Sequence, residues 1–304
     1  MENATRWIGS GPIRGGPPPG PALRSGMPDF DALTDLSSAV TLNNGVRMPV
    51  LGLGTWKADD GPEAVAAVRD ALEVGYRHVD TAAVYKNEQS VGDALKEFGN
   101  RDEVFVTTKL WNDRHGDVAA AMDESLEKLK LDHVDLYLVH WPLGLNFLNT
   151  WREMEKLVEV GKTRAIGVSN FQRHHVQVIL DAGLTAPAVD QVEFHPKLVQ
   201  AELHAFLREH GVVSEAWSPL MQGGFADEPV IQRVSRETGK SPAQVLVRWD
   251  LQHGVVTIPK STNRTHIEAN ADVFDFQLSD AQMQDLNALD EHHRFGPDPD
   301  VLGV

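Results

Sequence analysis

The feature of this sequence that most restricts its fold is a regular alternation of short apolar runs with longer amphipathic segments. The apolar runs resemble buried parallel strands and lie near 50–54, 77–80, 103–108, 134–139, 163–168, 187–192, 212–217 and 254–258. Helical patterns lie between them, for instance over 62–74, 118–129, 150–160 and 242–252. Eight such units in succession predict an α/β protein, a closed (β/α)8 barrel of the TIM type.

Three segments outside the alternation complete the predicted architecture. Residues 40–50 predict a β-hairpin with Asn44-Gly45 as its turn, and because two strands are not stable alone, we expect the hairpin to plug the bottom of the barrel. The tail 291–304 is expected to lie over the body. Residues 1–37 are rich in Gly, Pro and Ser and bury too little apolar surface to offset their ordering entropy. We therefore expect 1–37 to be a disordered leader and 38–304 a single barrel domain.

Composition narrows the cellular setting and the partners. The net charge of −16 repels nucleic acid and anionic membrane surfaces. The absence of cysteine excludes disulfides, thiolate nucleophiles and sulfur metal sites. No apolar run approaches the roughly 20 residues that a membrane span needs, and 1–37 contain no signal-peptide core. We expect a cytoplasmic monomer whose partner is a small molecule, with neither nucleic acid nor membrane bound.

Polar side chains follow three successive strands of the predicted barrel. Asp80 ends the strand near 77–80 with Tyr85 just beyond it, Lys109 follows about 30 residues later, and His140 about 30 residues after that. A βα unit has about this length, so each strand delivers its group to the C-terminal face of the barrel, where barrel enzymes carry out their chemistry. An acid, a phenol, an amine and an imidazole are thus expected to converge.

Each of the four has an ordinary structural interpretation when taken alone. Asp80 could cap a helix, Lys109 could be a solvated loop lysine, Tyr85 a half-buried aromatic and His140 a buried histidine with its hydrogen bonds satisfied. Their joint placement favours a functional interpretation. A phenol with a pKa of about 10 is a poor acid at neutral pH, but a lysine held charged by a carboxylate lowers that pKa. With a neutral imidazole to orient a carbonyl group, the set is suited to protonating a developing alkoxide.

The sequence resembles the aldo-keto reductases over about 40–300. The matching stretches keep the family's order and spacing: 51–56 (LGLGTW), 80–85, 108–112 (TKLWN), 138–142 (LVHWP), 166–171 (IGVSNF), 190–196 (DQVEFHP) and 258–261 (IPKS). Within the family it looks closest to bacterial 2,5-diketo-D-gluconate reductases, with 215–220 (EAWSPL) where many members carry tyrosine. The resemblance implies a catalytic tetrad of Asp80, Tyr85 as general acid, Lys109 and His140.

The resemblance also implies NADPH bound across the barrel mouth without a Rossmann domain, in agreement with the absence of a strand-linked Gly-x-Gly-x-x-Gly. By motif match, the expected cofactor contacts are Ser169, Asn170 and Gln191 at the carboxamide, Trp217 stacked on the nicotinamide, and Ser218 and Leu220 at the pyrophosphate. Taken alone, Ser169-Asn170 could be a helix N-cap and Trp217 could be a core residue. The aromatic pocket expected for small carbonyl substrates consists of Trp56, Trp111 and Trp141, whose alternative role is core packing.

The adenosine end departs from the family pattern. Lys260 and Ser261 match, but His266 replaces the arginine that NADPH-dependent members usually carry, and Ala269 replaces a glutamate before Asn270. A mostly neutral histidine cannot replace the charged, planar guanidinium that binds a 2′-phosphate. We therefore expect weakened NADPH preference with NADH also used, although Arg264 and Lys260 are available to compensate.

Three other functions are open at this stage. A metal hydrolase could draw ligands from His78, Asp80, His140 and His195, although we expect no metal. A lyase could use Lys109 in a Schiff base. A regulatory protein could bind a nicotinamide cofactor on the same fold with weak catalysis. The sequence favours a fourth function, NAD(P)H-dependent reduction of small aldehydes or ketones, such as 2-oxoaldehydes or diketo sugars, to alcohols.

Overall fold

The computed structural model describes residues 29–143 and 147–302, and its centre is a closed parallel barrel. The sheet has eight strands paired in chain order: β4 (Leu53–Gly54), β5 (His78–Asp80), β6 (Phe105–Leu110), β7 (Val134–Val139), β8 (Thr163–Ser169), β9 (Val189–Glu193), β10 (Val213–Trp217) and β11 (Val256–Thr257). Parallel bridges from Leu51 to Thr257 and from Gly54 to Lys260 join the first strand to the last. The predicted (β/α)8 barrel is confirmed.

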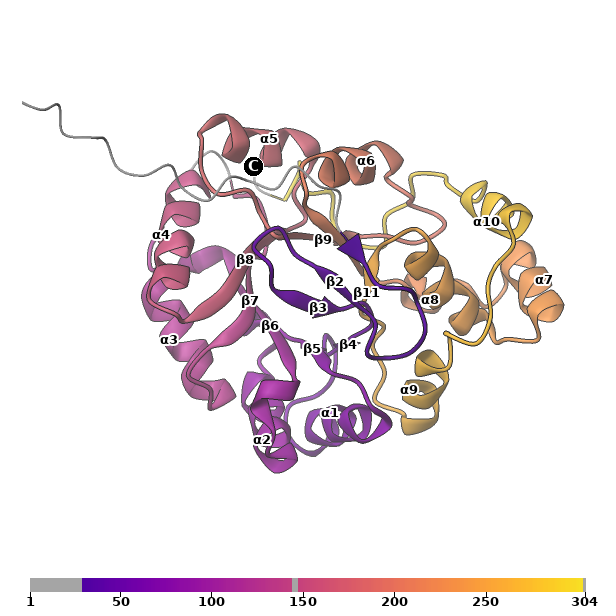
Figure 1. The fold of residues 1–304 in the computed structure, drawn as a ribbon, viewed down its shortest axis with the longest axis horizontal. Coiled ribbons are helices and arrows are strands. Elements are labelled where there is room, and N and C mark those ends of the chain that lie inside the picture. The colour runs from indigo at the N-terminus through magenta and orange to yellow at the C-terminus, as the bar shows by residue number, and fades with distance from the viewer. Residues whose placement is uncertain (1–28, 144–146, 303–304) are drawn as a thin grey trace, which may run out of the picture.

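Helices surround the barrel as an outer ring (Figure 1). They are α1 (Pro62–Val74), α2 (Glu88–Phe98), α3 (Val118–Leu129), α4 (Phe147–Glu159), α5 (Arg173–Asp181), α6 (Ala201–Glu209), α7 (Pro229–Thr238), α8 (Pro242–Gln252), α9 (Arg264–Ala271) and α10 (Asp280–Asn287). Three of the four helices predicted from periodicity have the expected bounds, and α4 begins three residues earlier than expected. Proline in the first turn of α1 and α8 explains why their starts were readable.

The N-terminal hairpin closes the bottom of the barrel. Its strands β2 (Ala39–Thr41) and β3 (Arg47–Pro49) pair antiparallel across the Asn44-Gly45 turn and lie over the barrel centre in Figure 1. Val40 and Met48 pack into the cluster of inward apolar residues that fills the lower barrel. The side-chain amide of Asn43 donates to the carbonyl of Pro187 at 2.9 Å, so the hairpin is fixed to the barrel by polar as well as apolar contacts.

The expected boundary of the leader needs a correction. Residues 1–28 lie outside the described residues, but 29–37 are part of the fold. Strand β1 (Asp29–Phe30) pairs antiparallel with β2, and Asp31 forms an ion pair with Arg47. Phe30, Leu33 and Leu36 pack against the main core. These three apolar side chains supply the burial that the Gly- and Pro-rich part of the sequence lacks.

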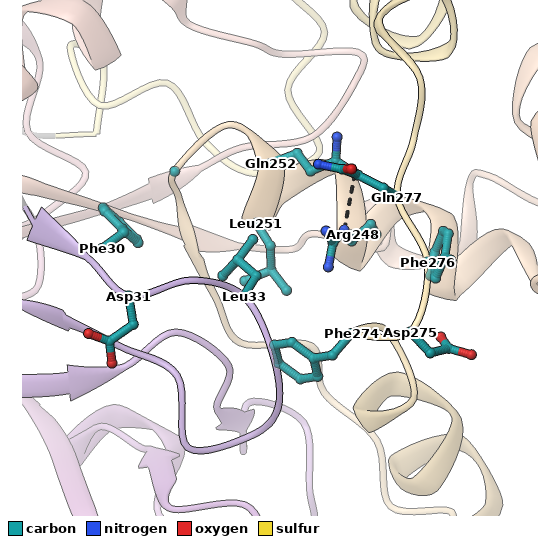
Figure 2. Close-up of a pocket in the computed structure, with 11 residues that line it drawn as sticks. Phe30, Asp31, Leu33, Arg248, Leu251, Gln252, Phe274, Asp275, Phe276 and Gln277 are labelled. Carbon is teal, nitrogen blue, oxygen red and sulfur yellow. Dashed lines mark hydrogen bonds between the residues drawn. The ribbon is translucent and has the colours of Figure 1, made fainter.

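An open pocket of about 690 Å³ lies beside α8, between residues 30–33 and 274–277 (Figure 2). Arg248 on its wall donates to Gln252 Oε1 at 3.0 Å and to the carbonyl of Val273 at 3.1 Å, which attaches the chain after α9 to α8. None of the side chains predicted to form the functional site lines this pocket. In the described part of the chain, no helix is long and apolar enough to cross a membrane.

Candidate active site

The C-terminal ends of β5, β6 and β7 bring the four predicted polar residues together. Asp80 is the last residue of β5, Lys109 lies in β6, and His140 directly follows β7. Tyr85 ends a single 3-10 turn, Ala83–Tyr85, that follows β5. Asp80 lies level with Thr107 on the neighbouring strand, and Lys109 with Leu138. Side chains two residues apart in a strand share a face. Lys109, two residues beyond Thr107, therefore points into the barrel together with Asp80.

Lys109 is the centre of this group and has no exposed surface. Its ammonium nitrogen lies 2.6 Å from Asp80 Oδ1, 2.9 Å from the carbonyl oxygen of Thr81 and 3.3 Å from the Tyr85 hydroxyl. An ammonium has three hydrogens to donate, so these partners use its full capacity. The lysine is therefore tied to both the acid and the phenol.

The charges of this pair depend on each other. Burial acts to lower the pKa of Lys109, but the charges of Asp80 and Tyr85 outweigh it and hold that pKa above its ordinary value. Burial is also the largest influence on the pKa of Asp80 and raises it, while Lys109 opposes that rise. An ion contact of 2.6 Å favours the charged form of both residues. We therefore treat them as an ion pair at neutral pH.

The pKa of Tyr85 corrects one expectation. Burial raises it above its ordinary value, and the opposing effect of Lys109 does not cancel that rise. The lysine contact was predicted correctly, but the predicted net lowering of the phenol pKa was wrong for the protein without bound ligands. The phenol is thus protonated at neutral pH, and Lys109 acts by limiting the cost of forming the phenolate.

His140 presents a neutral imidazole beside the phenol. Burial and the neighbouring Lys109 charge lower its pKa well below 6.5. Its ring meets Tyr85 edge-on at 5.8 Å between centroids and Trp111 at 5.1 Å, and its Nδ1 has no hydrogen-bond partner among the described residues. Because Nδ1 is itself buried, the other ring nitrogen, Nε2, is the one available to a ligand group in the cavity that His140 lines.

A cavity of about 870 Å³ opens above these residues. Its lining includes three of the four predicted catalytic residues, the three tryptophans and much of the predicted cofactor set: Asp80, Tyr85, His140, Trp56, Trp111, Trp141, Ser169, Asn170, Gln191, Trp217, Ser218, Leu220 and Lys260. Lys109 lies beneath the cavity rather than on its wall. Trp56 is 42% exposed and Trp141 only 7%, so Trp56 forms an outer wall while Trp141 also belongs to the core.

Ser169, Asn170 and Trp217 form a connected polar wall. Trp217 Nε1 donates to Asn170 Oδ1 at 2.8 Å, Asn170 Nδ2 donates to the carbonyl of His140 at 3.0 Å, and Ser169 Oγ donates to the carbonyl of Gln191 at 2.8 Å. Asn170 and Ser218 have φ values of 63° and 53°. Such strained backbone in non-glycine residues is concentrated at functional sites.

The sequence did not indicate that Gln191 and Glu215 contact each other. Gln191 Nε2 donates to Asp80 Oδ2 at 2.8 Å and also to Glu215 Oε2 at 2.9 Å. Gln191 was predicted only as a carboxamide contact, and Glu215 only as part of a motif. The signal available in the sequence was a charged residue within the strand β10, two residues before Trp217.

The predicted adenosine end lies around α9. Lys260 is on the cavity wall, Ser261 precedes the helix, His266 is exposed in its first turn and Asn270 is buried. Arg264, which we expected to be able to compensate, takes part in surface ion pairs. It is paired with Glu73 at 2.6 Å and with Asp70 and Glu268, because α9 packs beside the acidic end of α1.

Two further segments reach the cavity. The C-terminal tail crosses the barrel towards α5 (Figure 1), as expected, and Glu193 holds it by accepting hydrogen bonds from the amides of Phe295 and Gly296. A Cβ at Gly296 would lie 2.4 Å from Cη2 of Trp217. Across the cavity, Lys57 Nζ donates to Gln222 Oε1 at 3.2 Å. These contacts were not readable from the sequence, because they join residues far apart in the chain.

The alternative chemistries find little support in this geometry. His78 Nε2 lies 3.3 Å from Thr107 Oγ1 and His195 Nε2 lies 3.1 Å from Glu193, so these residues are not grouped with Asp80 and His140 as a ligand set. In the described ranges, the grouping with ligand-like spacing is His174, His175 and Asp300 at the surface. A Schiff base at Lys109 would require a neutral amine, whereas the site holds the ammonium form.

Comparisons with known proteins agree with the geometry. The model of the aldo/keto reductase family matches residues 50–291. Glyoxal reductase of Bacillus subtilis strain 168 is 51% identical over 272 residues, covering 88% of this chain and 99% of the relative. Methylglyoxal reductase DkgA of Escherichia coli strain K12 is 45% identical, covering 88% and 98%.

A solved structure gives the same relationship in three dimensions. The aldo-keto reductase of Bombyx mori in complex with NADP is 36% identical, with a TM-score of 0.81, covering 86% of this chain and 95% of that one.

Proposed function

The chain belongs to the aldo/keto reductase family, and we propose that its substrates are small 2-oxoaldehydes of the glyoxal and methylglyoxal type. It is an oxidoreductase that reduces carbonyl groups with a nicotinamide cofactor, and the family uses NADPH. The observation that supports the reaction best is the set of contacts between Lys109, Asp80 and Tyr85 at the base of the cavity. A purely regulatory role is not favoured, since this group is complete and the relatives are named as reductases.

Support for the substrate class comes from the relatives and from the cavity. Two relatives that the chain covers over almost their full length are named for glyoxal and methylglyoxal reduction. The cavity wall near His140 is aromatic, with Trp111 in edge contact and Trp56 partly exposed at the rim. Such a wall contacts a small two- or three-carbon substrate through its apolar face and leaves the carbonyl group to the polar residues below.

The proposed roles follow from the hydrogen bonds. When bound, the cofactor supplies the hydride that adds to the carbonyl carbon. Tyr85 gives its proton to the carbonyl oxygen, which completes the alcohol, and the phenolate left behind is 3.3 Å from the Lys109 ammonium. His140 hydrogen-bonds the carbonyl oxygen and orients it, because its imidazole is neutral and lies on the cavity wall beside Tyr85. Asp80 keeps Lys109 charged.

The cavity residues fit a nicotinamide dinucleotide. The wall of Ser169, Asn170 and Gln191 offers amide and hydroxyl groups to a carboxamide, and the indole of Trp217 is fixed by its bond to Asn170. The backbone of Ser218 and Leu220 would meet the pyrophosphate, with Lys260 as a nearby cation on the same cavity wall. We assign Ser261, His266 and Asn270 to the adenosine half on the motif match.

The proposal includes use of NADH beside NADPH. His266 stands where the phosphate-binding arginine is usual, and Arg264 already forms ion pairs with three carboxylates. Lys260 is then the remaining cation of the predicted set. A single ammonium gives weaker discrimination for a 2′-phosphate than a bidentate guanidinium.

The proposed activity is tested by initial rates of NADPH and NADH oxidation with glyoxal, methylglyoxal, a sugar diketone and a simple ketone. We expect turnover with both cofactors and the highest kcat/KM for the 2-oxoaldehydes. A preference for the diketone would overturn the substrate class. NADH turnover thousands of times less efficient than NADPH turnover would remove the cofactor proposal, and binding without turnover would favour the regulatory function.

The proposal also covers the domain organisation, the oligomeric state and the cellular location of the enzyme. We propose a single domain that begins at residue 29 rather than 38. We also propose a cytoplasmic monomer that binds no nucleic acid, with the net charge of −16 as the support for the last point. Light scattering after gel filtration tests the monomer. A dimeric mass would overturn it.

A further inference from the structure

A second buried carboxyl group lies under the catalytic residues. Glu215 is at an inward position of β10 and has no exposed surface. Its Oε2 accepts from Gln191 Nε2 at 2.9 Å, and the same amide nitrogen donates to Asp80 Oδ2 at 2.8 Å. Its Oε1 has no hydrogen-bond partner in the described part of the chain and lies 3.6 Å from His78 Nε2.

The donors around Glu215 are already engaged. Lys109 uses its three hydrogens on Asp80, Thr81 and Tyr85, and Gln191 uses both amide hydrogens on the two carboxyl groups. One cation therefore serves two buried acids. If both were ionised, one negative charge would remain uncompensated in the barrel interior, which is very costly.

We propose that Glu215 is a positioning residue for the reaction: as an uncharged acid it shares the Gln191 amide with Asp80, and its ionisation at alkaline pH delays formation of the Tyr85 phenolate. Sharing the amide fixes the orientation of the Gln191 side chain. Both of its amide hydrogens point to the two acids, which leaves Oε1 of Gln191 for the cavity. The second effect is electrostatic. This inference rests on the proposed role of Tyr85.

The groups that face Glu215 determine the sign of its effect. Asp80 and His78 face it from β5, Lys109 from β6 and Gln191 from β9, while β11 contributes Val256 and Thr257, which do not titrate. Burial, and then the charge of Asp80, raise the pKa of Glu215 to about 8. Burial lowers the pKa of His78 to about 3, so this imidazole adds no charge.

The kinetic consequence differs between the two directions. Carbonyl reduction needs protonated Tyr85, and alcohol oxidation needs the phenolate. An ionised Glu215 raises the pKa of Tyr85, so it extends reduction to higher pH and retards oxidation. Removing the ionisable group should therefore shift the falling limb of the reduction profile and the rising limb of the oxidation profile to lower pH.

The test compares pH profiles of kcat for Glu215→Gln and the wild type in both directions. The matched control is Glu88→Gln, a buried carboxyl on α2 that accepts from Thr108 outside the barrel interior. We expect E215Q to shift the oxidation limb downward by about one pH unit, the order of a single charge acting across several ångströms of protein. E88Q should retain the wild-type profile. An unshifted E215Q profile would overturn the inference.

A second measurement uses the wild type alone and does not depend on folding of the variant. Carbon-13 NMR of protein labelled at the glutamate carboxyl should show one resonance that titrates near pH 8. Complete titration of all glutamates below pH 6 would overturn the inference. Failure of the proposed function has a different signature, since the wild type would then show no carbonyl reduction at any pH.

Discussion

Replacing Asp80 with asparagine should separate a true buried ion pair from a pair of neutral hydrogen-bonded groups. Asp80 and Lys109 are both buried and lie 2.6 Å apart. The D80N substitution would leave the ammonium without its contacting counter-ion, because Gln191 carries no charge and Glu215 would have to ionise in the barrel interior to replace Asp80. Removing one partner of a buried pair costs about 3–5 kcal/mol.

An independent limit gives a similar magnitude for D80N. When its counter-ion is removed, Lys109 can avoid being a buried unpaired charge by giving up its proton. Doing so at pH 7 from an ordinary pKa of about 10.4 costs about 1.36 kcal/mol for each of roughly 3.4 units, or about 4.6 kcal/mol. The destabilisation therefore cannot greatly exceed about 5 kcal/mol, and we expect a value between about 3 and 5 kcal/mol.

The matched control is Asp250→Asn on α8. Asp250 is fully buried and accepts from Thr257 Oγ1 at 2.6 Å, and burial raises its pKa well above its ordinary value. Burial thus disfavours its charged form, and no cation contacts it among the described residues, so an amide of the same shape should cost about 1 kcal/mol or less.

The assay is urea unfolding at pH 7 followed by fluorescence, with the free energy of unfolding extrapolated to water for wild type, D80N and D250N. The reasoning predicts a gap of at least about 2 kcal/mol between the two variants. Equal costs would refute the ion pair, and with it the assignment of Lys109 as a permanent cation beside Tyr85.

Three further predictions concern contacts at the cavity. Gly296→Ala would place a Cβ 2.4 Å from Trp217, so we expect the tail to shift and cofactor Kd to rise about tenfold, measured by fluorescence quenching; an unchanged Kd would show that the tail does not constrain the indole. His266→Arg should lower KM for NADPH about tenfold without changing KM for NADH, and His266→Gln is the control; equal changes for both cofactors would contradict the assignment of this position. Lys57→Met removes the donor to Gln222 across the cavity, so release of NADPH, measured by stopped flow, should be a few-fold faster. A slower release would show that the contact does not close the cavity.

Periodicity and motif order predicted the barrel and the convergence of the four polar residues. Strand alternation requires Asp80 and Lys109 to point into the barrel once β5 and β6 are in register, and successive parallel strands end at the same face. Local signals also predicted α1 and α8, whose prolines mark their first turns. These features depend on residues near each other in the chain or on a regular repeat.

What the sequence did not reveal depends on long-range packing. The net rise in the pKa of Tyr85 reflects burial by several elements, and the motif indicates only the neighbouring lysine. The ion pairs of Arg264 with Asp70 and Glu73 join it to a helix far away in the chain. The shared use of Gln191 by Asp80 and Glu215 joins three strands, and no spacing rule in the sequence predicts such a contact.

The most direct test of the central claim is a single-turnover measurement of proton donation by Tyr85. Wild type and Tyr85→Phe are first loaded with NADPH, their Kd values are compared, and each complex is then mixed with methylglyoxal while cofactor absorbance is followed. The account predicts unchanged cofactor Kd and a hydride-transfer rate lower in Y85F by at least about a hundredfold, since only the general acid is lost. A near-normal rate in Y85F would show that another group supplies the proton and would contradict the account.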